Sequence, residues 1–180
     1  MFELSLHILD LVQNAIAAGA TLIGIGIAVD HAAGTLTITI GDDGRGMDAA
    51  LLEQAASPFG TTRTSRKVGL GIPMFEQLAE QCSGALTLES EPGAGTRLTA
   101  RFALDSIDLP PMGDLPGTMR ALILGAPDAT DFTLSYRVDA RAFAFDTREV
   151  RAQLGGVPLG EPDVLNWIGE YIGEGLAQLS

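Results

Sequence analysis

LHILDLVQNAIAAGAT, residues 6–21, is the stretch on which the fold prediction depends. Its apolar residues recur at helical spacing, and His7, Asp10 and Asn14 share one stripe beside them. An α-helix turns by about 100° per residue, so these polar positions fall within about 60° of one another. Taken alone, the stripe is most simply the solvated face of an amphipathic helix. Whether it has a function depends on the rest of the chain.

The composition is that of an acidic globular protein. The 180 residues include 23 Asp and Glu but 11 Lys and Arg, which gives a formal net charge of −12. This charge argues against nucleic acids and anionic membrane surfaces as partners, because both attract basic patches. The single cysteine, Cys82, cannot form an internal disulfide and favours a cytoplasmic location. The first residues lack a basic leader and no apolar run approaches about 18 residues, so we expect neither a signal peptide nor a membrane span.

Hydrophobic periodicity predicts an order of helices and strands up to residue 104. Three helices are expected over residues 2–18, 48–55 and 69–83. Two β-hairpins are expected from residues 22–30 with 35–40 and from residues 85–91 with 96–104. Gly19 suits a left-handed end of the first helix, and residues 56–68 are expected to form a loop. This order predicts an α+β fold in which helices cover one face of a mostly antiparallel sheet.

The segment LPPMGDLPG separates this unit from a C-terminal tail. The tail contains three strand-like runs, at residues 118–125 (TMRALILG), 131–139 and 141–146, and a final helix over residues 163–179. We therefore predict a principal domain, a linker and a small α+β extension, over residues 1–108, 109–117 and 118–180. Aromatic residues of the extension, including Trp167 and Tyr171, form either a further layer of core or an interface with a partner or a second copy.

The segment DDGRGM (42–47) directly follows a predicted strand and offers a candidate binding group for a base. An ionised carboxylate accepts hydrogen bonds and cannot donate them, so Asp42 could take a proton from the amino group of adenine. Guanine presents a carbonyl at that edge and would be rejected. Gly44 and Gly46 would let the backbone pass close to the base. An acidic glycine turn without a ligand remains the alternative for this segment.

Glycines also open the helix predicted from residue 69, in the sequence GLGI (69–72). Backbone N–H groups at a helix N-terminus, together with the helix dipole, can bind an anion. Arg63, Arg66 and Lys67 precede this helix and form a local basic patch in an acidic chain, which suits phosphate groups. A merely solvated loop is the alternative here.

The polar stripe of the first helix can serve the same ligand. Asn14 offers a neutral oxygen for Mg²⁺, which is usually held by one or two protein oxygens together with phosphates and waters. Asp10, one turn earlier, could orient and deprotonate an attacking water or hydroxyl. Thr96, in the hairpin turn GAGT (93–96), could hydrogen-bond beside Asp42.

Five motifs in this order resemble the GHKL ATPases, the superfamily that includes histidine kinases, Hsp90, type II topoisomerases and MutL. LVQNAIAAGAT is similar to the N box and DDGRGM to the first glycine box. SPFGTTR is similar to the F box of kinases and VGLGI to the second glycine box. ESEPGAGTRLTARF resembles the last hairpin of histidine kinase catalytic domains, the members that this chain resembles most. The resemblance covers about residues 1–104 and implies a two-layer sandwich of the Bergerat type that binds ATP and Mg²⁺.

Carried over by position, the resemblance implies that Asn14 coordinates Mg²⁺, that Asp42 holds the adenine amine and that Thr96 assists at the base. Asp10 falls where the ATP-hydrolysing and serine-kinase branches carry a catalytic glutamate, and its side chain is one methylene shorter. The residues expected to contact the nucleotide are Asn14, Asp42, Gly44, Gly46, Thr62, Arg63, Lys67, Gly69, Leu70, Gly71 and Thr96.

The function predicted from these features is that of a stand-alone kinase module that phosphorylates a partner protein, whose identity the sequence does not give. His7 is not followed by the acidic residue usual at phosphorylated histidines, so we do not expect it to be the acceptor. Two alternatives stay open on this fold. One is an ATPase that acts as a conformational switch, and the other is a non-catalytic, anti-sigma-like module that only senses ATP.

Overall fold

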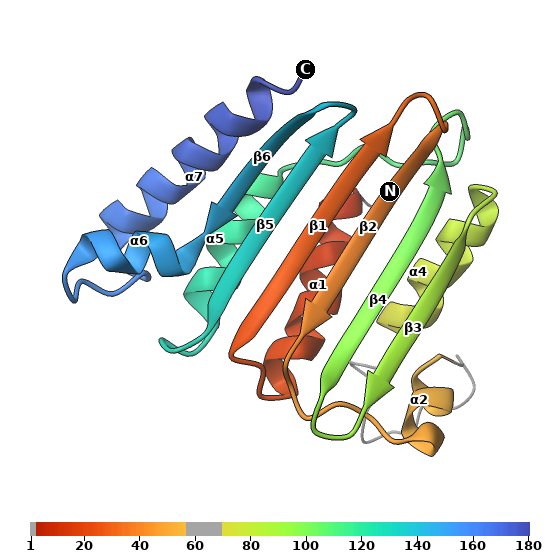
Figure 1. Ribbon diagram of the computed structural model, residues 1–180, viewed down its shortest axis with the longest axis horizontal. Coiled ribbons are helices and arrows are strands. Elements are labelled where there is room, and N and C mark those ends of the chain that lie inside the picture. The colour runs from red at the N-terminus through yellow and green to blue at the C-terminus, as the bar shows by residue number, and fades with distance from the viewer. Residues whose placement is uncertain (1–2, 57–69) are drawn as a thin grey trace.

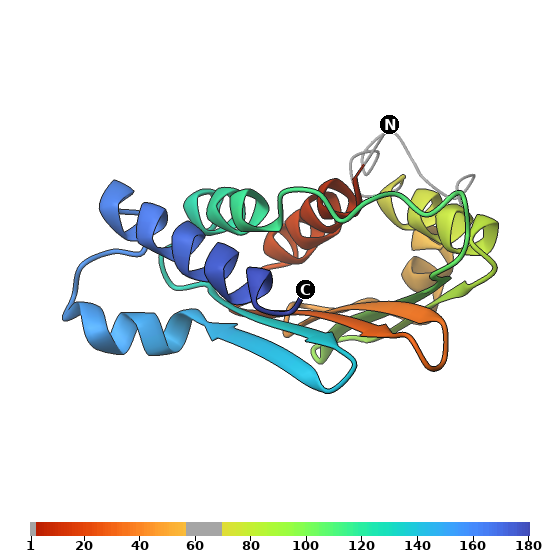
Figure 2. The same cartoon turned by 90° about the horizontal axis from the view of Figure 1, so that it is seen from above.

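The computed structural model describes residues 3–56 and 70–180 and has two layers. One layer is a six-stranded sheet, and helices cover one of its faces (Figures 1 and 2). The helices are α1 (Leu4–Ala17), α2 (Ala49–Ala55), α4 (Gly71–Gln81), α5 (Leu115–Gly125), α6 (Thr147–Leu154) and α7 (Pro162–Ala177). The strands are β1 (Leu22–Asp30), β2 (Thr35–Asp42), β3 (Ala85–Glu91), β4 (Gly95–Ala103), β5 (Asp131–Val138) and β6 (Arg141–Asp146).

The sheet is mixed, and its strand order is β3-β4-β2-β1-β5-β6. β1 and β5 pair in parallel, and every other neighbouring pair is antiparallel. This confirms the predicted α+β class, with a mostly antiparallel sheet covered on one face. None of the helices in the part of the chain that the structure describes is long and apolar enough to cross a membrane.

The core lies between the sheet and the helices, as the alternation of the strands predicts. Ile25 of β1 pairs with Ile40 of β2, and both side chains are buried against α1. α1 contributes Ile8 and Val12, neither of which has any exposed surface. Burying one such side chain contributes about 1.5–3 kcal/mol, so this face holds the sheet and helices together. Gly19 has φ 78°, which confirms the predicted left-handed end of α1.

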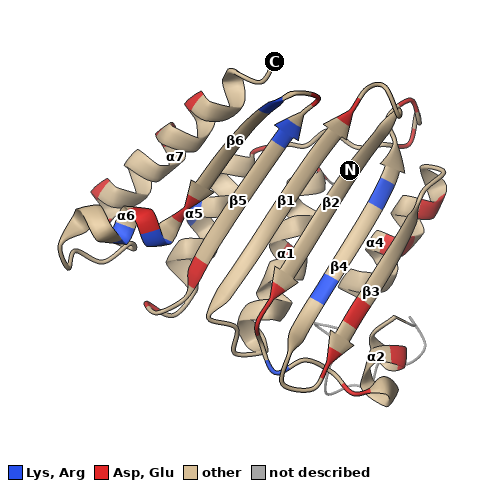
Figure 3. Cartoon of the chain, in the orientation of Figure 1, with Lys and Arg blue, Asp and Glu red and all other residues tan. Residues whose placement is uncertain are grey.

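The uncovered face of the sheet carries small side chains. Gly24 of β1 pairs with Gly41 of β2, and Gly26 pairs with Thr39. The two arginines of β4, the blue bands on that strand in Figure 3, are exposed and alternate with its buried residues, so they stand on this face. This face therefore has no apolar layer to bury.

The run TMRALILG, predicted to be a strand, lies in α5, and that prediction is wrong. The buried residues Leu115, Met119, Leu122 and Ile123 stand at i, i+4, i+7 and i+8, which is a helical period that begins before the run. Asp114 caps the helix by accepting a hydrogen bond from the N–H of Gly117 at 2.9 Å. The sequence analysis also missed α6, a short helix that directly follows β6.

The C-terminal segment joins the same sheet as the N-terminal part. β5 lies beside β1, and α5 packs against both α1 and α7. The segment predicted as a linker also contacts α1, since the carbonyl groups of Pro111 and Met112 accept hydrogen bonds from the N–H groups of Leu4 and Ser5. The division at residues 108 and 118 stays a prediction about independent folding.

Candidate functional site

A pocket of about 260 Å³ opens between three helices and two strands. It is bordered by α1, α2 and the start of α4, by the end of β2 and by the start of β4. It lies on the helix-covered side of the sheet, and Asp42 stands at its edge, where β2 ends. Residues from α1, from the first glycine segment (residues 42–47) and from the β3–β4 hairpin meet here, although they are far apart in the sequence. Among the predicted site residues, the pocket is lined by Asn14, Asp42, Gly46 and Thr96.

The carboxylate of Asp42 is held by the backbone that follows it. Its Oδ1 atom accepts a hydrogen bond from the N–H of Gly44 at 2.7 Å. Burial raises the pKa of Asp42 above its ordinary value and the neighbouring Asp43 raises it further, while the N–H groups of Gly44 and Thr96 act in the opposite direction. A half-buried carboxylate with a fixed orientation is suited to accept a hydrogen bond from a ligand.

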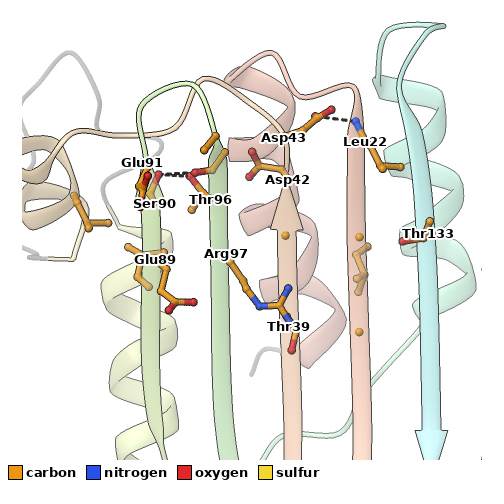
Figure 4. Close-up of a pocket in the computed structure, with 18 of the residues that line it drawn as sticks. Leu22, Thr39, Asp42, Asp43, Glu89, Ser90, Glu91, Thr96, Arg97 and Thr133 are labelled. Atoms are coloured by element: carbon orange, nitrogen blue, oxygen red, sulfur yellow. Dashed lines mark hydrogen bonds between the residues drawn. The ribbon is translucent and has the colours of Figure 1, made fainter.

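Asp43, the neighbour of Asp42 in the sequence, has a structural role. Its carboxylate accepts hydrogen bonds from the N–H groups of Thr21 and Leu22 at 2.7 and 2.9 Å and from the Thr21 hydroxyl at 2.7 Å. These bonds tie the end of β2 to the start of β1, and the bond from Leu22 is drawn in Figure 4. The same donors, with Leu22 first, lower the pKa of Asp43. Asp42 and Asp43 thus face different surroundings and differ in role.

The first glycine segment is packed against other backbone. A β-carbon at Gly46, whose φ is 70°, would collide with the carbonyl of Glu91 in β3. A β-carbon at Gly44 would lie 2.9 Å from the carbonyl oxygen of Ala18 at the end of α1. The sequence analysis expected both glycines to contact the nucleotide. The structure adds a second reason for them, since any side chain here would push α1 and the β3–β4 hairpin away.

Ser90 fixes the segments beside the pocket, and its role was not predicted from the sequence. Its Oγ atom accepts a hydrogen bond from the N–H of Met47 at 2.8 Å and lies 2.8 Å from both the carbonyl oxygen of Gly95 and the Oγ1 of Thr96 (Figure 4). Ser90 therefore links the first glycine segment to Thr96. Its position three residues before Gly93 of the hairpin turn was the only sequence signal.

The polar stripe of α1 divides into three environments. Asn14 lines the pocket, and its Nδ2 atom is buried without a hydrogen-bond partner among the residues that the structure describes. His7 instead stacks on Phe75 of α4, with ring centroids 5.3 Å apart, and burial lowers its pKa while the charge of Asp10 acts in the opposite direction. Asp10 is exposed and lies beside Gly71 at the start of α4. The stripe is therefore more than a solvated face.

The structure describes the second glycine segment (residues 69–72) from residue 70 onward. α4 begins at Gly71, Ile72 lines the pocket, and Leu70 is 49% exposed outside the pocket lining. The predicted nucleotide contacts Thr62, Arg63, Lys67 and Gly69 lie outside the described residues.

A shallow hollow of about 1040 Å³ lies on the uncovered side of the sheet and shares Asp42 and Thr96 with the pocket. Figure 4 shows the Arg97 side chain reaching across β2 toward Thr39 in this hollow. No group of three or more His, Cys, Asp or Glu within residues 3–56 and 70–180 is placed to hold a metal.

Comparisons with known proteins find similar segments in sensor proteins and kinases. The chain is 35% identical over 103 residues to a sensor protein of Shewanella frigidimarina and 36% identical over 94 residues to the sensor histidine kinase CpxA of Escherichia coli K12. These matches cover 56% and 49% of this chain, but 16% and 20% of those two proteins. Sporulation kinase C of Bacillus subtilis is 30% identical over 92 residues, which are 49% of this chain and 20% of the kinase.

A solved structure, the N-terminal domain of a DNA repair protein, shares the fold. It superposes with a TM-score of 0.54 over 80% of this chain and 52% of its own, at 14% sequence identity. Residues 3–106 match the family described as histidine kinase-, DNA gyrase B- and HSP90-like ATPase, and these residues carry the whole pocket. From this match, the chain belongs to the histidine kinase-, DNA gyrase B- and HSP90-like ATPase family.

Proposed function

We propose that the chain binds Mg-ATP in the pocket between α1 and the end of β2 and acts as a stand-alone kinase module on a partner protein. The observation that carries the proposal is the meeting of Asp42 and Asn14 in one pocket, the first with a fixed carboxylate and the second with an unsatisfied amide. An unsatisfied buried polar group costs about 1–3 kcal/mol, so a ligand that completes it is favoured.

Asp42 would identify the base. Its carboxylate accepts a hydrogen bond from the amino group of adenine, whereas the carbonyl of guanine at the same position would leave two acceptors facing each other. Thr96, held by Ser90 next to Asp42 in the pocket lining, supplies a hydroxyl beside the base. We therefore expect ATP to be preferred over GTP.

Asn14 would hold the metal through its amide oxygen. Neutral amide oxygens are suitable Mg²⁺ ligands. The Nδ2 atom of the same amide has no hydrogen-bond partner in the described part of the chain, so it is free to donate to a bound ligand. Bound Mg²⁺ supplies charge neutralisation for the phosphate oxygens. Asn14 lies on α1, and a helix is a rigid support for a ligand-holding side chain.

Asp10 would accept the proton from the attacking hydroxyl or water. It is exposed, so an acceptor group can reach it, and it lies beside Gly71 at the N-terminus of α4. A positioned general base typically contributes about 10²–10⁴-fold to a rate.

The acceptor would lie on another protein. His7 lies on α1, the helix that also carries Asn14. Its ring is stacked on Phe75 and partly buried, which makes it a poor phosphate acceptor. CpxA and sporulation kinase C, by their names, are kinases, and this likeness favours phosphoryl transfer over a pure switch. We also propose a cytoplasmic location, since Cys82 is a fully buried free thiol.

Calorimetric titration with Mg-ATP, followed by a phosphate-release assay, tests the proposal on the wild type, Asp42→Asn and Asp10→Ala. We expect Asp42→Asn to weaken binding by about tenfold or more, and Asp10→Ala to keep binding while release falls by about 100-fold or more. Binding by both the wild type and Asp10→Ala, with no release from either and no transfer to added proteins, would favour the ATP sensor. Absence of binding in the wild type would refute the site.

A further inference from the structure

The exposed side of α7 carries two stacked aromatic rings. Trp167 and Tyr171 are 50% and 42% exposed, and their ring centroids lie 5.1 Å apart with 17° between the planes. Tyr171 also contacts Phe143 of β6, with the centroids 5.6 Å apart. These three residues form a continuous aromatic strip from the edge of the sheet onto α7. Tryptophan and tyrosine side chains at such positions often dominate the energy of protein interfaces.

Acidic residues border this strip, and none of them has a basic partner. Asp163, Glu170 and Glu174 lie within about 60° of Trp167 around the helix axis. α7 contains no lysine or arginine, and Figure 3 shows red bands on it without blue. No ion pair joins these three acids to another residue in the described part of the chain. The strip is therefore apolar at its centre and negatively charged along one side.

We propose that this strip is the docking surface for a protein segment that carries apolar side chains flanked by arginine or lysine. The stacked rings offer faces for apolar contact and for cation–π interaction with a guanidinium or ammonium group. The adjacent carboxylates would pair with the same cations as water is excluded. No residue that lines the ATP pocket belongs to α7, so the inference stands apart from the proposed nucleotide site.

A second copy of the chain does not fit the charge of this surface. If two α7 helices paired antiparallel across the strip, Asp163 of one copy would approach Glu174 of the other. In a parallel pair, each acid would face its own equivalent. Like charges brought together at an interface weaken association, so the homodimer considered from the sequence is disfavoured at this site. Nucleic acids and anionic lipids are repelled for the same reason.

The protein has its own reporter for this surface, because Trp167 is the only tryptophan in the 180 residues. The probe is a short tryptophan-free peptide of leucine and lysine with apolar residues at helical spacing. A twin in which glutamate replaces every lysine serves as the charge control. We expect the lysine peptide to shift the emission of Trp167 saturably, less strongly at high salt, and the glutamate twin to leave it unchanged.

Two charge-reversal variants locate the effect. Glu170→Lys with Glu174→Lys should weaken binding of the lysine peptide by about tenfold or more. Asp105→Lys with Asp108→Lys changes the net charge equally at exposed positions outside α7, and the affinity should stay within about twofold. Quenching of the unmodified protein gives a second measurement. Relative to its effect on free tryptophan, caesium should quench Trp167 more than iodide does, because the surrounding acids attract cations and repel anions.

Several results would overturn the proposal. Equal responses to the two peptides, or equal losses in the two charge-reversal variants, would show that the strip does not select basic segments. A concentration-dependent dimer that disappears in Trp167→Ala would assign the strip to a second copy. An emission shift with phosphatidylserine vesicles but not with the lysine peptide would assign it to a membrane surface. None of these results bears on ATP binding, which is measured separately by calorimetry.

Discussion

The carboxylate of Asp10 lies directly against the α-carbon of Gly71. Its Oδ2 atom is 2.8 Å from the position that a β-carbon at Gly71 would occupy. The proposed general base on α1 and the first residue of α4 therefore share one small space. The glycine is needed there because any side chain would displace the carboxylate.

Gly71→Ala tests this relationship. Asp10 is exposed and its carboxylate can rotate away, so we expect the fold to survive, and alanine at the start of α4 adds about 0.5–1 kcal/mol of helix stability. The displaced carboxylate should lower phosphate release by about tenfold or more, since small displacements of a catalytic group are costly. Melting temperature and phosphate release, measured on the same samples, check both expectations.

The double variant Asp10→Ala with Gly71→Ala is the control. If the alanine acts by displacing the carboxylate, adding it to Asp10→Ala should cause no further loss of release. Fully additive losses would instead mean that Gly71 contacts the nucleotide by itself, as the family resemblance implies.

Asp42→Asn should separate binding from stability. The amide oxygen of asparagine can still accept the hydrogen bond from the N–H of Gly44, which leaves its NH₂ group facing the adenine amine. A hydrogen bond to a charged group contributes about 1.5–3 kcal/mol, so the affinity for ATP should fall by about 10- to 150-fold. Calorimetry on the two proteins measures this ratio, and an unchanged Kd would place the base elsewhere.

The same variant has a pH signature in the absence of nucleotide. Burial raises the pKa of Asp42 above its ordinary value of 3.8. Between pH 3.8 and the raised pKa, the folded state therefore binds more protons than the unfolded state. The stability that Asp42 contributes therefore falls as the pH rises from 3.8 through the raised pKa. Asparagine has no such cost, and the melting temperature of Asp42→Asn relative to the wild type should increase from about pH 4 to pH 7. A constant difference across this range would contradict the raised pKa.

The sequence predicts this site better than it predicts the C-terminal segment, for a physical reason. Asn14, Asp42 and Thr96 each follow a strong local pattern, namely an amphipathic helix, a strand end and a hairpin turn, and the pairing of β2 with β4 places Thr96 opposite Asp42. Ser90 could not be predicted because its role depends on the N–H of Met47, which is 43 residues away. The run TMRALILG favours a strand locally, but its tertiary contacts with α1 and α7 make it helical.

Ser90→Ala should weaken nucleotide binding without unfolding the chain. It removes the acceptor for the N–H of Met47 and the hydroxyl that contacts Thr96, so two residues that line the pocket lose a fixed position. We expect the Kd for ATP to rise by about three- to tenfold, which corresponds to one net hydrogen bond of about 1 kcal/mol. Ser106→Ala is the matched control, because the Ser106 hydroxyl accepts only a surface hydrogen bond from Asp108 at 3.2 Å. Equal effects of the two substitutions would contradict the role of Ser90.

Arg151→Met should loosen the C-terminal segment and leave the ATP pocket intact. The Arg151 guanidinium donates to Asp131 at 2.8 Å and to the carbonyl groups of Asp128 and Thr130, which fixes α6 to the start of β5. Thr147 adds a further bond to the same Asp131 carboxylate at 2.8 Å. Removing the guanidinium leaves part-buried acceptors without a donor, so the free energy of unfolding should fall by about 1–3 kcal/mol.

Arg148→Met is the control for that substitution. Arg148 pairs with Asp146 at 2.8 Å, but its side chain is 54% exposed, and solvent screening leaves a surface pair of this kind with little effect on stability. Denaturant unfolding should therefore distinguish the two variants, while calorimetry should give both the wild-type Kd for ATP. A parallel loss of ATP affinity in Arg151→Met would show that the contact between β5 and β1 transmits disorder to the nucleotide site. It would also contradict the prediction that residues 1–108 form a unit independent of residues 118–180.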